Sequence, residues 1–258
     1  MTTNFIRSRI VPCALFYTAL LLGWQVLVVL RIGPSYIFPS PLNVALSLAE
    51  GFRDRSFWFG ILVSFRRLLT GFSLAIAVGG VLGALLLKSR TFEKTAGSLI
   101  LGLQTLPSIC WFPLALVWFG LSEGSIIFVV VMGSVFSFTM TIHAGLKNIP
   151  PIYVNIGRNM GVRGPALLWD VFIPAALPSL LLGLRQSWAF AWRSLLAGEL
   201  LFNSQGLGFL LNMGRELNDI NRVVAVMLVI MAIGVFIDKL VFGRMELAVR
   251  TRYGLKPS

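Results

Sequence analysis

The sequence predicts an all-α polytopic membrane protein that crosses the bilayer about six times. Of its 258 residues, 57% are hydrophobic and only 12% are charged, whereas a soluble globular chain carries about 25% charged residues. The mean hydropathy is +0.84, and the apolar residues gather in runs of about 20, the length that a spanning helix needs. This composition excludes a water-soluble globular domain. It also excludes a disordered chain, which would be polar and poor in aromatic residues.

A single transmembrane domain is expected to take up the whole chain, residues 1–258. The six spans are expected at residues 10–30, 57–87, 96–120, 125–145, 175–202 and 223–241. The first run is long, and no small-residue cleavage site follows it before Arg31, so we expect a retained helix rather than a signal peptide. A proline-containing loop follows, with an amphipathic stretch at residues 42–52.

Basic residues interrupt the second span, and prolines interrupt the third. Arg66 and Arg67 are expected at the outer membrane surface, where long basic side chains can reach water. Pro107 and Pro113 lie within the third span, and a proline inside a helix kinks or locally unwinds it. Membranes tolerate such breaks where the freed carbonyl groups find partners.

The distribution of Lys and Arg predicts the orientation, because cytoplasmic loops carry the excess of positive charge. One set of alternate connections holds twelve of them: Arg7, Arg9, Lys88, Arg90, Lys94, Lys147, Arg158, Arg163, Arg244, Arg250, Arg252 and Lys256. The opposite set holds five, or seven if the second span begins late. Both termini and residues 150–174 are therefore expected in the cytoplasm. The net charge of +12 is thus a topology signal rather than a sign of nucleic-acid binding.

Residues 150–174 form a polar stretch between the fourth and fifth spans. Ile152, Ile156 and Met160 recur at helical spacing and predict an amphipathic helix. A break at residues 161–165 separates it from a second short amphipathic stretch at residues 166–172. We therefore expect a helix–turn–helix at the cytoplasmic membrane surface. From the residues alone it is either an ordinary interfacial connector or a helix that docks into a groove of a soluble partner.

The end of this segment carries a spaced pattern of glycine, apolar residues and proline. Gly161 is followed, after nine residues, by Val-Phe-Ile-Pro at residues 171–174. Ala-Ala-Leu-Pro at 175–178 and Gly-Leu-Arg at 183–185 continue the pattern. This pattern resembles the EAA loop in permease subunits of bacterial ABC importers. The chain departs from that motif at its opening, where Asn-Ile-Gly at 155–157 stands in place of Glu-Ala-Ala. The resemblance implies contacts with an ATPase subunit through Asn155, Gly157, Arg158, Met160, Gly161, Val162 and Pro165.

Further motifs resemble permeases for nitrate, sulfonates, taurine and bicarbonate. They are Phe-Pro-Ser-Pro at 38–41, Leu-Pro at 106–107, Trp-Phe-Pro-Leu at 111–114, Trp-Phe-Gly-Leu-Ser-Glu at 118–123, Ala-Trp at 191–192, Ala-Gly-Glu at 197–199 and Gly-Leu-Gly at 206–208. The resemblance implies a type I ABC importer permease fold in a bacterial inner membrane. It also implies a homodimer that works with two ATPase subunits, which bind ATP and Mg, and with an extracytoplasmic solute-binding protein.

Charged residues inside the fifth span are candidate functional groups, because an ionisable side chain at bilayer depth costs about 3 kcal/mol or more. Arg185 and Glu199 share a helix face but lie about 21 Å apart along the axis, too far to pair. Arg185 and Arg193 either attract an anion along the path or lock the bundle, and Glu199 suits a gate or a structural pair. The candidate path residues are Gln104, Trp111, Ser137, Arg185, Trp188, Arg193 and Glu199.

The expected function is transport without catalysis in this chain. It has no Gly-x4-Gly-Lys-Ser/Thr loop to hold nucleotide phosphates, no catalytic residue is expected, and ATP hydrolysis is assigned to a partner subunit. Cys13 and Cys110 lie alone in apolar runs and His143 is the only histidine, so no metal site is expected. The expected solute is a small anion. A vitamin precursor stays open as the solute, as does a stand-alone secondary transporter as the protein class.

Overall fold

The structure, a computed structural model, describes the backbone of residues 2–30 and 37–253, and the side chains of all of these except residues 2–10, Cys13 and Pro165. The described residues form helices and connecting turns, with no strand among them, which confirms the all-α fold class. The first half contains α1 (Thr2–Val29), α2 (Pro41–Arg53), α3 (Ser56–Leu86), α4 (Arg90–Thr105), the 3₁₀ turn η1 (Ser108–Trp111), α5 (Phe112–Phe119) and α6 (Glu123–Lys147).

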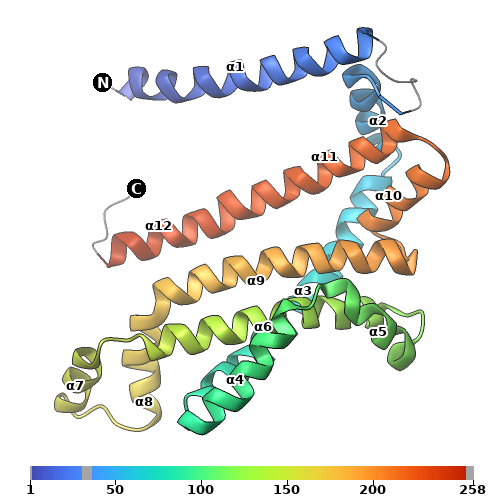
Figure 1. Cartoon of the computed structure of the whole chain (residues 1–258). Helices are drawn as coiled ribbons and strands as arrows, with labels where there is room; N and C mark the ends of the chain where they lie inside the picture. The colour runs from blue at the N-terminus through green and yellow to red at the C-terminus, as the bar shows by residue number, and fades with distance from the viewer. Residues whose placement is uncertain (1, 31–36, 254–258) are drawn as a thin grey trace.

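The second half continues the helical chain. It contains α7 (Pro151–Asn159), α8 (Pro165–Leu167), the π-helical turn η2 (Leu168–Phe172), α9 (Ile173–Phe202), α10 (Leu207–Glu216), α11 (Ile220–Ile237), the π-helical turn η3 (Asp238–Phe242) and α12 (Gly243–Arg252). Figure 1 shows α9, α6 and the α11–α12 helix running side by side, with α7 and α8 gathered at one end.

The packed centre of the molecule consists of α3, α6 and α9. Glycines let these helices approach closely, as small residues do between membrane helices. A Cβ added at Gly83 of α3 would lie 2.7 Å from Ile142 of α6, and one at Gly183 of α9 would lie 2.0 Å from the Cγ2 atom of Thr141. Both contacts place α6 between its two neighbours.

Four helical segments among the described residues are long and apolar enough to cross a membrane. They are Ser56–Leu86, Glu123–Lys147, Leu168–Phe202 and Ile220–Arg252. The bent pair of α4 with the η1–α5 helix makes a fifth if it forms one span. In the first predicted span, Ala14–Val29 forms a shorter apolar helix. The count of six spans stays a prediction.

The third predicted span is not one continuous helix. α4 ends at Thr105, and the axis bends by 101° before Ser108. Leu106 takes an extended conformation (ψ 125°), because the ring of Pro107 disfavours a helical residue before it. The expected break therefore occurs at Pro107. Pro113 instead lies in the first turn of α5, where its missing N–H costs nothing.

The remaining outer elements pack around the end of this bundle. α2, the predicted amphipathic stretch, packs on α11, and Val44 and Phe57 enter a shared core with residues of α10 and α11. α1 touches this part of the chain through α2, and the indole N–H of Trp24 donates to the carbonyl of Pro39 (3.0 Å). α1 otherwise lies apart from the central helices (Figure 1).

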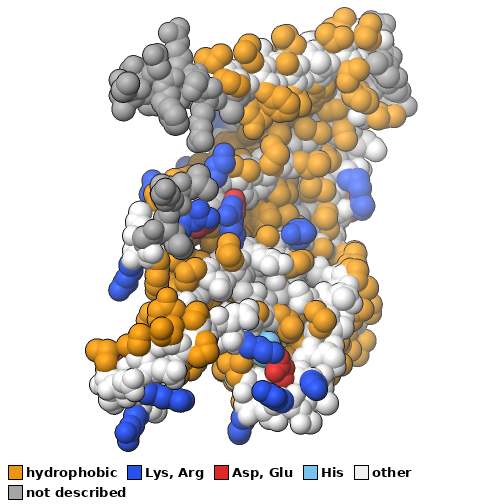
Figure 2. All heavy atoms as spheres, turned by 60° about the vertical axis from the view of Figure 1, so that its left-hand side comes forward, with side chains coloured by type: hydrophobic (Ala, Val, Ile, Leu, Met, Phe, Trp, Pro, Cys, Tyr) orange, Lys and Arg blue, Asp and Glu red, His pale blue; other side chains and the backbone are white. Residues whose placement is uncertain are grey.

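The surface is apolar along the helices and basic at one end. Many large apolar side chains are exposed, including Leu62, Val81 and Val117, as expected of helices whose solvent is lipid. Figure 2 shows Lys and Arg side chains gathered at the end that carries α7 and the start of α4. This is the end that the charge distribution predicts to be cytoplasmic.

Candidate functional site

The segment between α6 and α9 forms the predicted helix–turn–helix. α7 runs from Pro151 to Asn159, and the chain then turns through Gly161 (φ +85°) and Gly164 (φ +62°). These left-handed conformations favour glycine, because any Cβ would strain the backbone there. α8 and η2 follow, and η2 continues directly into α9 at Ile173. The predicted break at residues 161–165 is confirmed.

The apolar stripe predicted on α7 is left uncovered by the part of the chain that the structure describes. Ile152 is 62% exposed, Ile156 49% and Met160 78%. At a membrane surface such a stripe is covered by lipid or by a partner protein. The polar residues Asn155 and Arg158 of the same helix are also exposed. α7 therefore offers both apolar and polar groups to whatever covers it.

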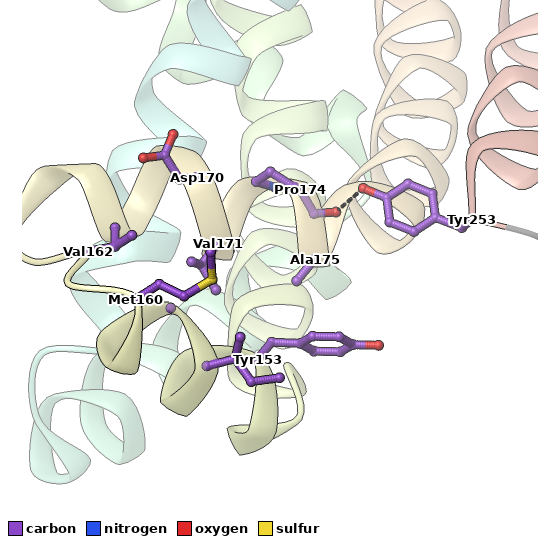
Figure 3. Close-up of a pocket in the computed structure, with 10 residues that line it drawn as sticks. Tyr153, Met160, Val162, Asp170, Val171, Pro174, Ala175 and Tyr253 are labelled. Atoms are coloured by element: carbon purple, nitrogen blue, oxygen red, sulfur yellow. Dashed lines mark hydrogen bonds between the residues drawn. The ribbon is translucent and has the colours of Figure 1, made fainter.

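One side of α7 packs closely against η2. Gly157 is buried, and a Cβ added there would lie 2.6 Å from the Cγ2 atom of Val171. An apolar groove of about 460 Å³ lies alongside this contact. Figure 3 shows Tyr153, Met160 and Val171 lining it, together with the first residues of α9 and Tyr253 from the C-terminal end.

The seven predicted coupling residues thus occupy different positions in one segment. Asn155, Arg158, Met160 and Gly161 are exposed, Gly157 is the packing point, and Val162 lines the groove. Pro165 begins α8, and its side chain lies outside the described part. Their contact with a partner stays a prediction.

Three of the predicted path residues come together at a polar cavity of about 280 Å³. Gln104, Ser137 and Arg193 line it, with Ser108 and Ser194 beside them. The cavity lies at the break between α4 and η1, where irregular backbone is tolerated because it borders a cavity rather than lipid. The Oε1 atom of Gln104 and the Oγ atom of Ser137 are buried and have no hydrogen-bond partner among the described residues.

Among the described residues that line this cavity, Arg193 alone is charged. Its Nε donates to the carbonyl of Ala189 (3.1 Å), and its guanidinium lies 5.1 Å from the centre of the Phe190 ring. Within the described residues, no carboxylate accepts a hydrogen bond from it. Its charge is therefore available to a bound anion.

A second cavity of about 480 Å³ shares Gln104 and Ser137 with the first. It runs between α6 and α9 toward Asn148, which caps the end of α6 next to α7. Thr141, Ser179 and Gln186 add polar groups to its lining. The two cavities together follow α6 from the α4–η1 break to the end that carries the helix–turn–helix.

The other four predicted path residues do not line either cavity. Arg185 donates to both carboxylate oxygens of Asp238 (2.6 Å each) and to Glu246 (3.3 Å), which favours the bundle-locking role. Asp238 is held in this ion pair. Trp188 packs edge-on against Phe72 at 5.2 Å.

The last two of these residues lie in packed positions. Trp111 packs near Phe136, with ring centres 6.1 Å apart. Glu199 is fully buried near the C-terminal end of α9, where it accepts hydrogen bonds from Ser64 (2.8 Å) and from the backbone N–H of Gly208 (3.0 Å).

The partner of Glu199 is Arg67, and the expected surface position of Arg67 is wrong. Arg67 is 3% exposed, and its Nη1 lies 3.1 Å from the Oε1 atom of Glu199. It also donates to the carbonyl of Gln205 and to Glu123 (3.0 Å). Arg66 is 63% exposed and pairs with Glu123 from outside, as a surface residue does. The adjacent positions differ because one helical step of 100° turns only Arg67 toward α9.

No group of three or more His, Cys, Asp or Glu side chains in the described part of the chain could hold a metal ion. His143 lies 3.1 Å from Glu93, whose other partner is Lys147. This cluster links α4 to the end of α6.

The sequence matches known transport proteins. A family model described as the binding-protein-dependent transport system inner membrane component matches residues 71–242. MJ0413 of Methanocaldococcus jannaschii, described as an ABC transporter permease protein, is 36% identical over 179 residues, covering 69% of this chain and 67% of that protein. The taurine transport system permease protein TauC of Escherichia coli is 28% identical over 237 residues, covering 90% and 86%. The bicarbonate transport system permease protein CmpB of Synechocystis is 26% identical over 242 residues, covering 90% and 86%.

The fold matches a solved transporter structure. The inward-facing MetNI methionine ABC transporter aligns with a TM-score of 0.59 and 19% identity, covering 76% of this chain and 94% of that one. At this identity the likeness concerns the fold alone.

Proposed function

Since this chain belongs to the family of binding-protein-dependent transport system inner membrane components, we propose that it forms the path of an ABC importer for a small anion. It is a transport permease subunit, and its family works with an ATPase and a binding protein. We also propose which residues contact the solute, which surface meets the ATPase, and how these two parts are connected.

The observation that carries this proposal is one continuous helical element between the two parts of the site. η2 packs on α7 through Val171 and Gly157, and it runs without a break into α9. α9 then carries Phe190, Arg193 and Ser194 into the polar cavity. A displacement of α7 by a partner would therefore be transmitted along α9 to the cavity.

The proposed partner surface is the exposed stripe of α7 with the turn that follows it. Apolar side chains at i, i+4 and i+8 suit a helix laid into a groove of a soluble protein. We place two ATPase subunits, with their ATP and Mg, against this surface in a homodimer of the chain. ATP binding would then switch the bundle between inward-open and outward-open states, which requires a ligand that favours one state over the other.

The orientation proposed is the one that the basic residues favour, with both termini and α7 in the cytoplasm. The binding protein then meets the opposite end, where α10 and the α5–α6 turn lie. At that end, Arg67 forms ion pairs with Glu123 and with Glu199.

A small anion is the proposed solute because of the charge balance of the cavities. Arg193 contributes a positive charge, and neither cavity has a carboxylate in its lining. The unpartnered oxygens of Gln104 and Ser137 are acceptors, and the Ser137 hydroxyl can also donate. The taurine and bicarbonate permeases among the relatives are consistent with this class.

The test is uptake into proteoliposomes that contain the chain, its co-purifying ATPase and its binding protein, with labelled taurine, nitrate, bicarbonate and a neutral pyrimidine as probes. We expect ATP-dependent uptake of one of the three anionic or zwitterionic probes. Arg193→Gln should lower that uptake at least tenfold, and Arg193→Lys should lower it less. Arg90→Gln is the matched control, because Arg90 is exposed and lies outside both cavities.

Uptake of the pyrimidine alone would overturn the anion assignment while leaving the importer assignment intact. Uptake that proceeds without the ATPase would identify a stand-alone transporter and overturn the proposal as a whole. Equal uptake by the Arg193 variants and the control would remove Arg193 from the path.

A further inference from the structure

A carbonyl group near the start of α9 lacks its helical hydrogen-bond donor. α9 begins at Ile173 and contains Pro178 in its interior. In an α-helix the carbonyl of residue 174 accepts from the N–H of residue 178, and a proline has no N–H to give. The carbonyl of Pro174 is therefore free to accept a hydrogen bond from a donor outside the helix.

The missing donor is supplied from the other end of the chain. The phenolic hydroxyl of Tyr253 donates to the carbonyl of Pro174 at 2.5 Å, although the two residues lie 79 positions apart. Tyr253 follows the last residue of α12. Figure 3 shows its ring beside the start of α9, in the groove that Tyr153 of α7 also lines.

A second contact ties the same two helices together. Arg185, which lies two turns beyond Pro178, holds Asp238 of η3 through two hydrogen bonds of 2.6 Å. Its Nη1 also reaches Glu246 of α12 at 3.3 Å. The C-terminal helix is therefore attached to α9 at its π-helical turn, along α12 and at its end. A π-helical turn inside a longer helix is a frequent feature of functional sites.

The Tyr253 contact is made at the second residue of α9, directly after η2. We propose that Tyr253 is a positioning residue that links the C-terminal helix α12 to the α7–η2 segment. A movement of α7 then reaches the last span as well as α9. This inference rests on the proposed function, because it assigns a second output to the same partner-facing segment.

The test measures backbone hydrogen exchange in the full-length chain in lipid nanodiscs, alone and with its co-purifying ATPase plus ATP and vanadate. In the natural chain, trapping with ATP and vanadate should slow exchange several-fold in both residues 150–174 and residues 243–252. In Tyr253→Phe, residues 150–174 should still respond, but residues 243–252 should not. Tyr17→Phe is the matched control, because Tyr17 is exposed on α1 and its hydroxyl has no partner among the described residues.

A second variant tests the chemical basis of the link. Pro178→Ala restores an N–H that can donate to the Pro174 carbonyl, so this carbonyl no longer needs the Tyr253 hydroxyl. In a Pro178→Ala background, Tyr253→Phe should therefore change exchange in residues 243–252 much less than it does alone. An effect of the same size in both backgrounds would contradict the assignment of the hydroxyl to the freed carbonyl.

The outcomes separate the two proposals. If residues 150–174 of the natural chain do not respond to the ATPase, the proposed function fails. If residues 150–174 respond and residues 243–252 respond equally in the natural chain and in Tyr253→Phe, the link proposed here is overturned and the proposed function stands. If both segments respond and only the link to residues 243–252 is lost in Tyr253→Phe, the inference is supported.

Discussion

Arg67 and Glu199 lie 132 residues apart in the sequence and form an ion pair of 3.1 Å. Both side chains are buried. Glu199 also accepts from Ser64 and Gly208, and Arg67 donates to the Gln205 carbonyl. The pair thereby joins α3 and α9 to the turn before α10. The pair lies near the C-terminal end of α9, whereas α7 lies by the N-terminal end of the same helix (Figure 1).

Breaking this pair should destabilise the protein strongly. Arg67→Ala leaves a buried carboxylate without its counter-charge, which costs about 3–5 kcal/mol. Arg66→Ala is the matched control, because Arg66 pairs with the same Glu123 but is 63% exposed, and exposed pairs contribute about 0–1 kcal/mol. Thermal unfolding in detergent, followed by tryptophan fluorescence, measures both. Similar melting temperatures for the two variants would show that the buried pair has no special structural role.

The close approach of α6 and α9 predicts a second stability effect. A Cβ at Gly183 would lie 2.0 Å from the Cγ2 atom of Thr141, so Gly183→Ala forces the helices apart at a cost of about 1–3 kcal/mol. Gly23→Ala is the control, because nothing lies within 4 Å of a Cβ at Gly23. We expect a lower melting temperature for the first variant and no loss for the second. A loss of the same size in both would point to glycine content rather than to this contact.

The turn after α7 predicts a coupling defect. Gly161 has φ +85°, so Gly161→Val strains the backbone of the turn, although no atom lies within 4 Å of a Cβ at this position. Gly161→Asn should be tolerated better, because asparagine adopts left-handed conformations more readily. In Gly161→Val, the amount of solute taken up per ATP hydrolysed should fall several-fold, while membrane insertion is unchanged. If valine and asparagine behave alike at this position, backbone strain is not the cause.

Two serines of α6, one in the polar cavity and one outside it, should differ in their effect on transport. Ser137→Ala removes a buried hydroxyl without a partner, so it should weaken uptake with little change in melting temperature. Ser134→Ala removes a hydroxyl that donates to the Val130 carbonyl away from the cavity, at a cost of at most about 1 kcal/mol. Uptake should be unchanged in that variant. A transport defect in Ser134→Ala alone would argue against the cavity as the path.

Hydropathy and helix-breaking residues were sufficient to predict most of the helical organisation. The expected fourth span at residues 125–145 corresponds to α6, and the break at residues 161–165 coincides with two glycines of positive φ. These features depend on local chemistry, namely a run of apolar residues or a backbone conformation that few residues adopt. The sharp bend after Thr105 also lies at the predicted proline, although its angle could not be read from the sequence.

Long-range pairing could not be predicted from the chain. Glu199 clearly needed a partner, but two neighbouring arginines were available, and only the packed structure shows that Arg67 faces inward. The small residues Ser64 and Gly71 lie on the same face of α3 as Arg67, and small residues at this spacing are the sequence signal that the face is buried. Pro178 likewise signals a free carbonyl, whereas its donor Tyr253 depends on how α12 packs.

Cysteine cross-linking to the ATPase tests whether α7 is the surface that meets the ATPase. In a chain whose Cys13 and Cys110 are replaced by serine, a cysteine is placed at Arg158 on α7 or at Leu121, which is 80% exposed at the other end of α6. A short bifunctional reagent is then applied to the assembled complex. We expect Arg158→Cys to join the chain to the ATPase subunit and Leu121→Cys not to do so. Cross-linking from Leu121→Cys, or from neither position in an active complex, would contradict this expectation.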